Sequence, residues 1–525
     1  MAKRALGINP STLIGWLSVA LVLVLTLGTL LAVFGRAEGA SSIGPSDWVA
    51  VRFTLLQAGL SAAISVILAV PLARALARRR FMGRGLLIAL MGAPFILPVI
   101  VAVLGLLAVF GRNGIASTVL VWAGFDPISI YGLGGVLLAH VFFNLPLATR
   151  LILQGWLAIP AERFRLAAEL GFSCRAVARH LERPMLRAVL PGAFMVVFLI
   201  CMTSFAVVLV LGGGPRATTV ELAIYQAFRF DFDLSKAAQL AGIQFTLGAL
   251  ATVVALRVSA PMSAGSGLDR VVMRWDSSAI WLRVQDSIIM LAAALFLLAP
   301  LAAILVAGTG QVFRLPPQVW LSAERSLLVA MAAMTLTVLF SLTMALNVVR
   351  LRHRRRLSMT IEAIGYLTLA ASPLVIGTGL FILLFPIANP VALALPVTAI
   401  VNAVMSLPFA LRILKPAIME VEQTYGSLAD SLGLRGTARL RLLILPRIRG
   451  PLGFAAGLAA ALSMGDLGVI ALFAGPDQAT LPMQLYRLMS AYRMAEAAGA
   501  ALLLLILSFA LFWMFDKGGR MNADT

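Results

Sequence analysis

The chain has 525 residues, of which 61% are hydrophobic and only 12% are charged. A soluble protein of this length does not need so much apolar surface, since soluble domains are usually close to half apolar. Apolar runs of 18 residues or more recur, and each is long enough to cross a hydrocarbon layer about 30 Å thick. The composition therefore excludes an ordinary soluble protein and predicts an all-α polytopic membrane protein.

The formal charge of +20 points to nucleic acid only if its distribution is ignored. With a cytoplasmic amino terminus, most of the Lys and Arg fall in the predicted cytoplasmic segments, as the positive-inside rule requires. The arginine clusters at residues 78–80 and 354–356 then mark cytoplasmic ends of helices. The expected partner of this charge is the lipid bilayer with its anionic headgroups, and no nucleic acid is expected.

Six membrane spans are predicted in the first half of the chain, residues 1–256. The first follows Lys3 and Arg4 and is too long for the core of a signal peptide, so we expect it to be retained. The six predicted spans cover residues 13–34, 53–76, 86–110, 133–156, 188–211 and 237–256.

The second half, residues 282–525, repeats this arrangement after a linker rich in Ser, Gly and charge at residues 257–281. Its predicted spans cover residues 282–308, 326–349, 360–385, 391–414, 452–474 and 495–515. About twelve transmembrane helices result, with both termini on the cytoplasmic side. Because each half has an even number of spans, the halves are two parallel six-helix repeats related by an axis along the membrane normal.

An internal repeat supports this division. The segment 145–184 matches the segment 407–446 without a gap at an offset of 262 residues, and twelve of the 40 aligned positions are identical. A Leu- and Ala-rich composition gives about three or four identities by chance. Both copies fall in predicted cytoplasmic loops, at about residues 157–187 and 415–449. The shared loop residues that we single out are Leu166, Ala167, Leu170, Gly171, Pro184 and their counterparts Leu428, Ala429, Leu432, Gly433, Pro446.

The spacing in these loops predicts a docking element. Tyr425, Leu428, Ala429 and Leu432 stand at i, i+3, i+4 and i+7, so they share one face of a short helix. Gly433 follows as a C-terminal stop, and after twelve more residues Pro446 begins the next apolar segment. The expected unit is helix, turn, helix and membrane re-entry. The alternative interpretation is that these are the ordinary amphipathic loops found in any polytopic protein. Two copies in matching frame make that interpretation less favoured.

A second pair of matching stretches follows the fifth span of each half. LVLGGGPRATTVELAIYQ, from Leu209, corresponds to ALFAGPDQATLPMQLYR, from Ala471. The Gly and Pro residues in both are interpreted as turn breakers.

The chain carries no motif for ATP chemistry or other catalysis. A phosphate-binding loop needs Lys after Gly, and none of the four Lys, at positions 3, 236, 415 and 517, follows a Gly. The two Cys lie in a loop and in a span, and the three His are scattered, so no disulfide framework and no metal site are expected. No catalytic residues are assigned, the chain is not expected to be an enzyme, and it needs no cofactor of its own.

Polar residues inside spans are candidates for a translocation pathway, because they are costly to place there. We single out His140, Asn144, Asn402 and Asp466. His140 and Asn144 share one helix face, and Asn402 corresponds to His140 at the same offset of 262 residues. Asp466 is hypothesised to help a cationic solute across. Hydrogen bonding between packed helices is an equally good explanation of all four.

The repeated loop resembles the cytoplasmic loop of ATP-binding-cassette importer permeases, whose pattern is Glu-Ala-Ala, three residues, then Gly. Here the frames are Arg165-Leu166-Ala167 and Ser427-Leu428-Ala429, so the leading Glu is missing from both. The resemblance implies that each loop seats a coupling helix in a groove of an ATPase subunit. ATP and Mg would then be bound by that partner, in two copies.

Over nearly its whole length the chain resembles the fused permeases of bacterial thiamine and thiamine pyrophosphate importers. The stretches that carry this resemblance are VRFTLLQAGLSAAISVILAVPLARALARRRFMGR from Val51, ILPVIVAVLGLLAVFGRNG from Ile96, YGLGGVLLAHVFFNLPLATRLILQ from Tyr131, LGGGPRATTVELAIYQA from Leu211 and SMGDLGVIALF from Ser463. The family implies alternating access in the bacterial inner membrane, with thiamine delivered by a periplasmic binding protein.

Two alternatives stay open at this point. Fused ferric-iron permeases share the architecture and differ in solute. A proton- or sodium-coupled secondary transporter can also be built from parallel six-helix halves, but it needs no repeated docking loop and favours several buried acids. A membrane-embedded enzyme lacks any clustered polar constellation in the sequence.

Overall fold

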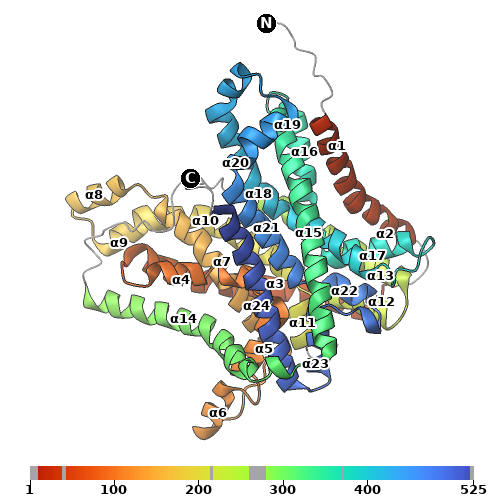
Figure 1. The fold of residues 1–525 in the computed structure, drawn as a ribbon. Coiled ribbons are helices and arrows are strands. Elements are labelled where there is room, and N and C mark those ends of the chain that lie inside the picture. Colours follow the sequence, from red (N-terminus) through yellow and green to blue (C-terminus); the bar gives the residue numbers. More distant parts are fainter. Residues whose placement is uncertain are drawn as a thin grey trace.

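The computed structural model describes residues 10–37, 43–212, 214, 217–258, 279–368 and 371–520. All regular secondary structure in this described part is helical (Figure 1). Eleven of the helical segments are long and apolar enough to cross a membrane. The predicted class, an all-α polytopic membrane protein, is confirmed. Most of the predicted linker, residues 259–278, lies outside the described residues.

The first half contains one long helix for most of the predicted spans, and shorter helices in the loops. Its elements are α1 (Pro10–Leu23), the π-turn η1 (Val24–Gly28), α2 (Thr29–Ala37), α3 (Pro45–Arg78), α4 (Arg84–Leu90), η2 (Ala93–Phe95), α5 (Val99–Phe110), α6 (Ile115–Trp122), α7 (Leu133–Leu157), α8 (Ala161–Glu169), α9 (Cys174–Val177), η3 (Ala178–Glu182), α10 (Arg183–Met202), α11 (Ala206–Leu211), α12 (Val220–Arg229) and α13 (Leu234–Val258).

The second half also contains long helices joined by shorter ones. They are α14 (Ile280–Thr309), η6 (Val312–Arg314), α15 (Pro317–Arg350), α16 (Arg355–Leu367), α17 (Pro373–Leu384), α18 (Ala394–Ser431), α19 (Gly436–Arg439), η7 (Leu440–Ile444), α20 (Leu445–Arg447), α21 (Arg449–Met464), α22 (Gly468–Phe473), η8 (Pro476–Gln478), α23 (Leu481–Ser490) and α24 (Met494–Arg520).

The third span of each half is not the continuous helix that we predicted. The span expected at 86–110 is split into α4, η2 and α5, and the one expected at 360–385 is split into α16 and α17. Pro98 precedes the first turn of α5 and Pro373 occupies the first turn of α17, where a missing N–H costs nothing. Proline disfavours a helical conformation in the residue before it, so the helix has to restart at these positions.

The fifth spans are broken as well, although continuous helices were predicted at 188–211 and 452–474. In the first half α10 ends at Met202 and α11 begins at Ala206. In the second half α21 ends at Met464 and α22 begins at Gly468. Backbone that leaves the helix at membrane depth is tolerated only where protein covers it or where it lines an internal space. Both breaks therefore mark the interior of the molecule.

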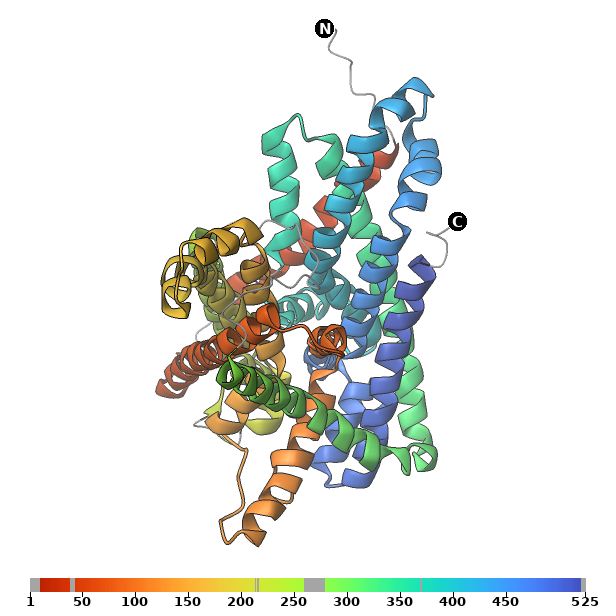
Figure 2. The ribbon, with the colours of Figure 1, turned by 90° about the vertical axis from the view of Figure 1, so that its left-hand side faces the viewer.

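The two halves are interlocked through their first helices. Helix α1 of the first half packs against α15 of the second, and α14 of the second half packs against α3 and α5 of the first. Figure 2 shows α14 lying across the elements of the first half. Where α1 crosses α15, Thr343 Oγ1 donates a hydrogen bond to Ser18 Oγ at 2.9 Å. Gly15 lies so close to Asn347 that a methyl group has no room there.

Where α14 packs against α3, ion pairs join the two halves. Asp286 of α14 is 1% exposed and accepts from Arg78 Nη2 at 2.8 Å and from Arg79 Nε at 2.7 Å. Two members of the arginine cluster at 78–80 therefore join the halves, in addition to the predicted role of marking a helix end. Removing one partner of a buried ion pair is strongly destabilising, since it leaves an uncompensated buried charge.

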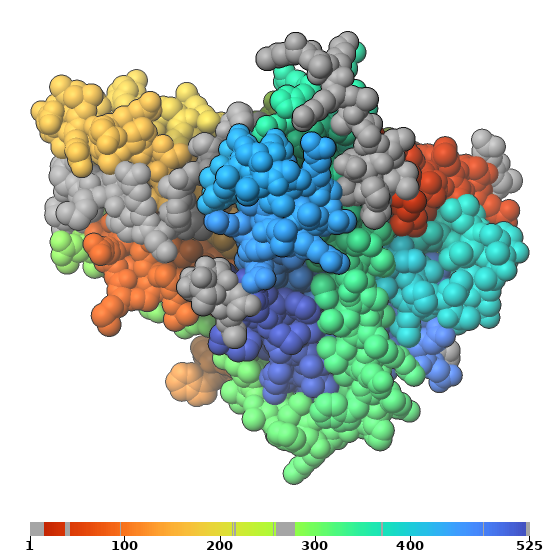
Figure 3. Space-filling view, turned by 45° about the horizontal axis from the view of Figure 1, so that its top comes forward, coloured from red at the N-terminus to blue at the C-terminus, as the bar shows by residue number. Residues whose placement is uncertain are grey.

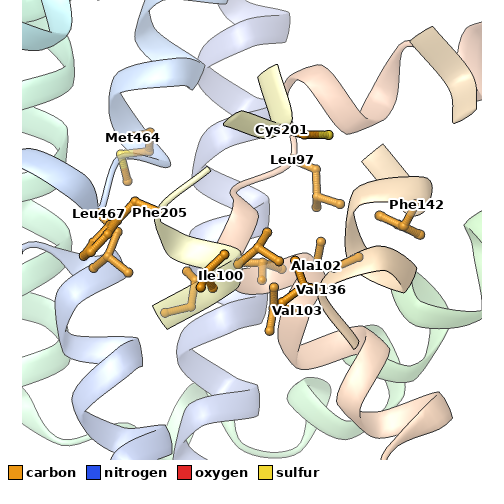
Figure 4. Packing of buried hydrophobic residues seen from close by; sticks show 14 of the residues in the cluster. Leu97, Ile100, Ala102, Val103, Val136, Phe142, Cys201, Phe205, Met464 and Leu467 are labelled. Carbon is orange, nitrogen blue, oxygen red and sulfur yellow. The ribbon is translucent and has the colours of Figure 1, made fainter. Parts of the chain in front are cut away.

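The main hydrophobic core runs through both halves. It includes Phe142 of α7, Leu467 beside α22 and Phe205 beside α11, three of the side chains labelled in Figure 4. A second cluster of buried residues joins α1, α15 and α18. Because one core contains residues from each half, the halves do not pack as independent domains.

Candidate functional site

The first repeated loop projects from the helical body as α8 and α9. In α8, Ala167 is 3% exposed, whereas Leu166 and Leu170 are 55% and 62% exposed. Gly171 ends the helix with φ of +65°, a left-handed conformation that glycine adopts at little cost. The alanine thus faces the protein and the two leucines, one turn apart, face outward.

The second loop presents the same pair of leucines on a different kind of helix. The expected separate short helix is absent there, since α18 continues without interruption from the fourth span to Ser431. At its end Ala429 is 2% exposed, while Leu428 and Leu432 are 58% and 66% exposed. Gly433 follows with φ of +67°. Four leucines at matching positions are therefore exposed, two on each loop.

Both loops lie on one face of the molecule. In Figure 3 the first loop, in yellow, and the second, in light blue, both come to the surface of the view. Single exposed leucines need no explanation, but matched exposed pairs on two loops of one face form apolar patches that fit a partner protein. We call the residues Leu166, Leu170, Leu428 and Leu432 the leucine pairs.

Ion pairs fasten the first loop to α3 and link two parts of the second loop to each other. Glu182, after α9, pairs with Arg74 of α3 at 3.0 Å. In the second loop Arg439 Nε donates to Glu422 at 2.9 Å and its Nη1 to Asp430 at 2.7 Å. Burial by itself lowers the pKa of Arg439, but its bonds to these two carboxylates raise the pKa more, and the net shift is upward. The first loop is thus fastened to α3, and in the second loop α19 is fastened to the end of α18.

Each loop returns to the membrane through a short π-helix just before its proline. These turns are η3 and η7, followed directly by Arg183-Pro184 and Leu445-Pro446. Proline has no N–H and cannot continue the regular ladder of helical hydrogen bonds. In the second loop the Arg447 guanidinium also stacks on the Tyr425 ring at 4.3 Å and donates to its hydroxyl at 2.9 Å. This contact therefore fastens α20 to α18.

The polar candidates in the spans form two clusters, one in each half. His140 Nδ1 lies 3.0 Å from Ser61 Oγ, and the Asn144 amide donates to Cys201 Sγ at 3.2 Å. In the second half Asn402 donates to Ser463 Oγ at 3.0 Å. The Asn144 amide also donates to the His140 carbonyl at 2.9 Å, and the Asn402 side chain hydrogen-bonds the Asp466 carboxylate. The structure thus brings the four residues together in two pairs, one in each half.

The breaks in the fifth spans lie where the halves meet. A Cβ on Gly465 of the second half would lie 3.1 Å from Pro98 of the first, and one on Gly468 would lie 3.9 Å from Phe205. Met464, Leu467 and Phe205 gather around this point in Figure 4. The centre of the molecule is therefore formed by interrupted helices of both halves.

Helices α12 and α23 carry features that the sequence had not singled out, beyond the turn-breaking glycines before them. The Val220 N–H donates to Thr54 Oγ1 at 2.9 Å, and the Leu481 N–H donates to Ser326 Oγ at 2.7 Å. Each helix start is thus tied to the second span of its own half. The shared Ala-Thr stretches of the matching segments, at 217–219 and 479–480, were the available signal.

Glu221, in the first turn of α12, was also missed because it lies outside every predicted span. Its side chain is completely buried, and within the described residues no Lys, Arg or His pairs with it. The side chains of Ser372, which precedes α17, and of Gln244 in α13 form hydrogen bonds with it. When the first residues of α12 and α23, Val220 and Leu481, are aligned, the equivalent residue in the second half is Pro482, so the halves differ here.

No family model matches the chain. It is 39% identical over 536 residues to the thiamine transport system permease protein of Brucella abortus, an alignment that covers 100% of this chain and 98% of the relative. It is 40% identical over 541 residues to the same protein of Salmonella typhimurium and 39% identical over 549 residues to that of Escherichia coli, with 100% of each chain covered.

The chain belongs to the thiamine transport system permease family. A more distant relative, a probable sulfate transport system permease protein of Helicosporidium, is 28% identical over 220 residues, which is 40% of this chain and 80% of that protein. The permease is therefore a multi-pass membrane transport protein. The matched leucine pairs and the broken fifth spans therefore need an explanation in terms of transport.

Proposed function

We propose that this permease is the transmembrane subunit of an ATP-binding-cassette importer for thiamine and its phosphates in the bacterial inner membrane. Full-length similarity to thiamine transport system permeases supports the solute. The observation that carries the coupling mechanism is the pair of exposed leucines, repeated on two loops of one face. Two copies of a separate ATPase, which bind ATP and Mg, occupy these two patches.

The proposed cycle couples closure of the ATPase pair to the spans. A periplasmic binding protein delivers thiamine to the outer side, and ATP binding draws the two ATPase subunits together. Each subunit moves one loop. In the second half this loop is the end of α18, a single 38-residue helix that also forms the fourth span. This helix contains Pro408 and Pro416, and its unbroken course joins the docking site to the membrane-spanning part. Both termini are then cytoplasmic.

The coupling residues and pathway residues have distinct roles in this proposal. Ala167 and Ala429 seat each loop against the body, Gly171 and Gly433 end its helix, and the leucine pairs contact the ATPase. Cys201 and Ser463, the bonding partners of Asn144 and Asn402, are equivalent positions of the fifth spans. His140, Asn144 and Asn402 thereby hold the spans beside the central breaks, and Asp466 meets the solute.

The decisive experiment reconstitutes the permease with its candidate ATPase and binding protein. ATP hydrolysis is followed as thiamine-loaded, iron-loaded or empty binding protein is added. We expect stimulation by the thiamine-loaded form. Stimulation only by the iron-loaded form retains the architecture and replaces the solute. With an assembled complex, uptake that does not depend on ATP refutes the coupling mechanism and favours a secondary transporter.

A further inference from the structure

Glu221 of α12 is a buried carboxylic acid that the proposed transport cycle does not use. Its exposed fraction is 0%, and no Lys, Arg or His of the described residues pairs with it. An ionised carboxylate without a cationic partner is costly to bury, so a group in this position takes up a proton instead. Glu221 is therefore a proton-binding position outside the coupling loops and the candidate pathway residues.

The hydrogen bonds of Glu221 join the two halves. Its carboxyl group bonds to the side chain of Gln244, in the same half, and to that of Ser372, in the second half. Gln244 Nε2 in turn donates to the carbonyl of Met202, where α10 ends, at 3.1 Å. Ser372 Oγ accepts from the Val375 N–H at 3.1 Å and so caps α17, which leaves the hydroxyl hydrogen to donate to Glu221. A chain of hydrogen bonds therefore connects the broken fifth span of the first half with the broken third span of the second.

Packing between α12 and α17 covers Glu221. The Phe228 ring of α12 meets the Phe381 ring of α17 edge to face, with centroids 4.5 Å apart. Phe228 lies two helical turns beyond Glu221 and therefore shares its face of α12. The Phe381 ring also lies 5.6 Å from that of Phe473 in α22. Separation of α12 from α17 removes the aromatic contact and the protein cover together, and it admits water to Glu221.

The charged groups around α12 do not neutralise Glu221. Helices α13, α3, α22 and α17 pack against α12, and α17 and α22 contain no titratable residue. The titratable residues of the other elements are Lys236 and Arg257 of α13, Asp47, Arg52, Arg74 and Arg78 of α3, and Tyr225 and Arg229 of α12 itself. None of them shifts the pKa of Glu221, which burial raises to about 8 against a smaller lowering by the bonds to Ser372 and Gln244. The carboxyl group is thus neutral at pH 7 in this arrangement.

We propose that protonated Glu221 is a tie between the two halves that releases its proton when α12 and α17 separate. In the described arrangement the neutral carboxyl group is sealed between the halves and bonds to Ser372 across them. After separation water reaches the group, which then ionises as an exposed Glu does and gives its proton to the solvent. Return to the described arrangement takes a proton up again. The equilibrium between the two arrangements therefore depends on pH.

The direction of this pH dependence follows from the raised pKa of Glu221. The described arrangement binds the proton more tightly than the separated one does. It is therefore most stable below pH 4.5, the ordinary pKa of the group, and loses stability as the pH rises toward about 8. Between these values each pH unit favours separation by up to about tenfold. The second half has no counterpart of this tie, since Pro482 occupies the equivalent position.

Infrared spectroscopy of the full-length permease in lipid nanodiscs tests the protonation. At pH 7 the wild type shows the carbonyl band of a protonated carboxylic acid that Glu221→Gln lacks, and this band is lost as the pH rises through about 8. Ser372→Ala removes a donor to the carboxylate and moves the loss of the band to higher pH. The matched control is Asp231→Asn, at an exposed acid just after α12, which keeps the wild-type band.

Hydrogen exchange of the α12 amides tests the link to separation. The quantity measured is the ratio of amide opening in the wild type to that in Glu221→Gln, in which the intrinsic pH dependence of exchange cancels. We expect this ratio to rise about 3- to 10-fold for each pH unit between about pH 5.5 and 7.5, because only the wild type can ionise. Asp231→Asn follows the wild type over the same range.

The outcomes are independent of the proposed function. A carboxylic acid band that is the same in the wild type and in Glu221→Gln overturns the tie, and so does an opening ratio that stays constant with pH. Both measurements use the permease without ATPase, binding protein or thiamine, so neither result bears on transport. A complex that does not transport thiamine overturns the proposed function and leaves the tie as it stands.

Discussion

Truncating the leucine pair of the second loop tests the coupling surface most directly. Leu428 and Leu432 are 58% and 66% exposed, so most of each side chain is available for burial against a partner. Replacing Leu by Ala removes three carbon atoms, worth about 2.4 kcal/mol when fully buried. Scaled by the exposed fraction, each truncation costs about 1.5 kcal/mol of docking free energy, and the double variant about 3 kcal/mol at most.

The expected result is weaker binding of the ATPase without loss of the fold. A cost of that size corresponds to a rise in Kd of about 10- to 100-fold, allowing for non-additivity between neighbours. Side chains this exposed contribute little to unfolding, so the thermal midpoint of Leu428→Ala/Leu432→Ala stays near that of the wild type. The assay is the Kd of the ATPase for the permease in lipid nanodiscs.

A matched control exists on α14. Leu291 and Leu295 are also one turn apart and are 62% and 58% exposed, but they lie within a candidate membrane span. Leu291→Ala/Leu295→Ala leaves the Kd unchanged. The corresponding pair of the first loop, Leu166 and Leu170, behaves like the second. An unchanged Kd in both loop variants, with wild-type permease binding the ATPase, refutes the docking role of the leucine pairs.

Three further predictions follow from single positions. Gly433→Asp abolishes transport without removing the protein from the membrane. Gly433 has a left-handed φ, so a side chain strains the backbone there, and the new charge lies at the end of the loop helix. Transport assays and membrane immunoblots check this. Asp286→Ala lowers the free energy of unfolding by about 3–5 kcal/mol, because it removes the buried carboxylate that pairs with two arginines. The control Arg80→Ala, at an exposed position, changes it by less than about 0.5 kcal/mol. Thermal unfolding in detergent measures both. Thr54→Val and Ser326→Ala each leave a buried N–H without its acceptor and cost about 1–3 kcal/mol, and equal thermal midpoints for variant and wild type would contradict this.

Much of the fold was predictable because it is encoded locally. A run of apolar residues long enough to cross the bilayer predicts a helix whatever surrounds it, and the all-α class followed from that rule alone. The 262-residue repeat located both loops, and Gly433 was read correctly as the residue that ends a helix. What failed were the interruptions in the third and fifth spans, since prolines and polar residues there do not lower hydropathy enough to break an apolar run.

In the candidate site too, local features were predictable from the sequence and long-range contacts were not. The sequence placed Leu428, Ala429 and Leu432 on one helix face, but only packing separates the buried alanine from the exposed leucines. Asp466 was visible as an acid within a span. The contact between Phe205 and Tyr225 was not visible, because aromatic residues in apolar segments are common and this contact joins different elements.

By itself, the sequence determined the all-α class, the apolar character of the spans and the position of the repeated loops. The tertiary structure alone decided that α1 and α14 pack on the opposite halves, that Arg78 meets Asp286 across 208 residues, and that both broken fifth spans lie at the centre. The physical reason is that helix formation depends on neighbours within a few residues, whereas these contacts depend on which surfaces pack together, and no local pattern records that choice.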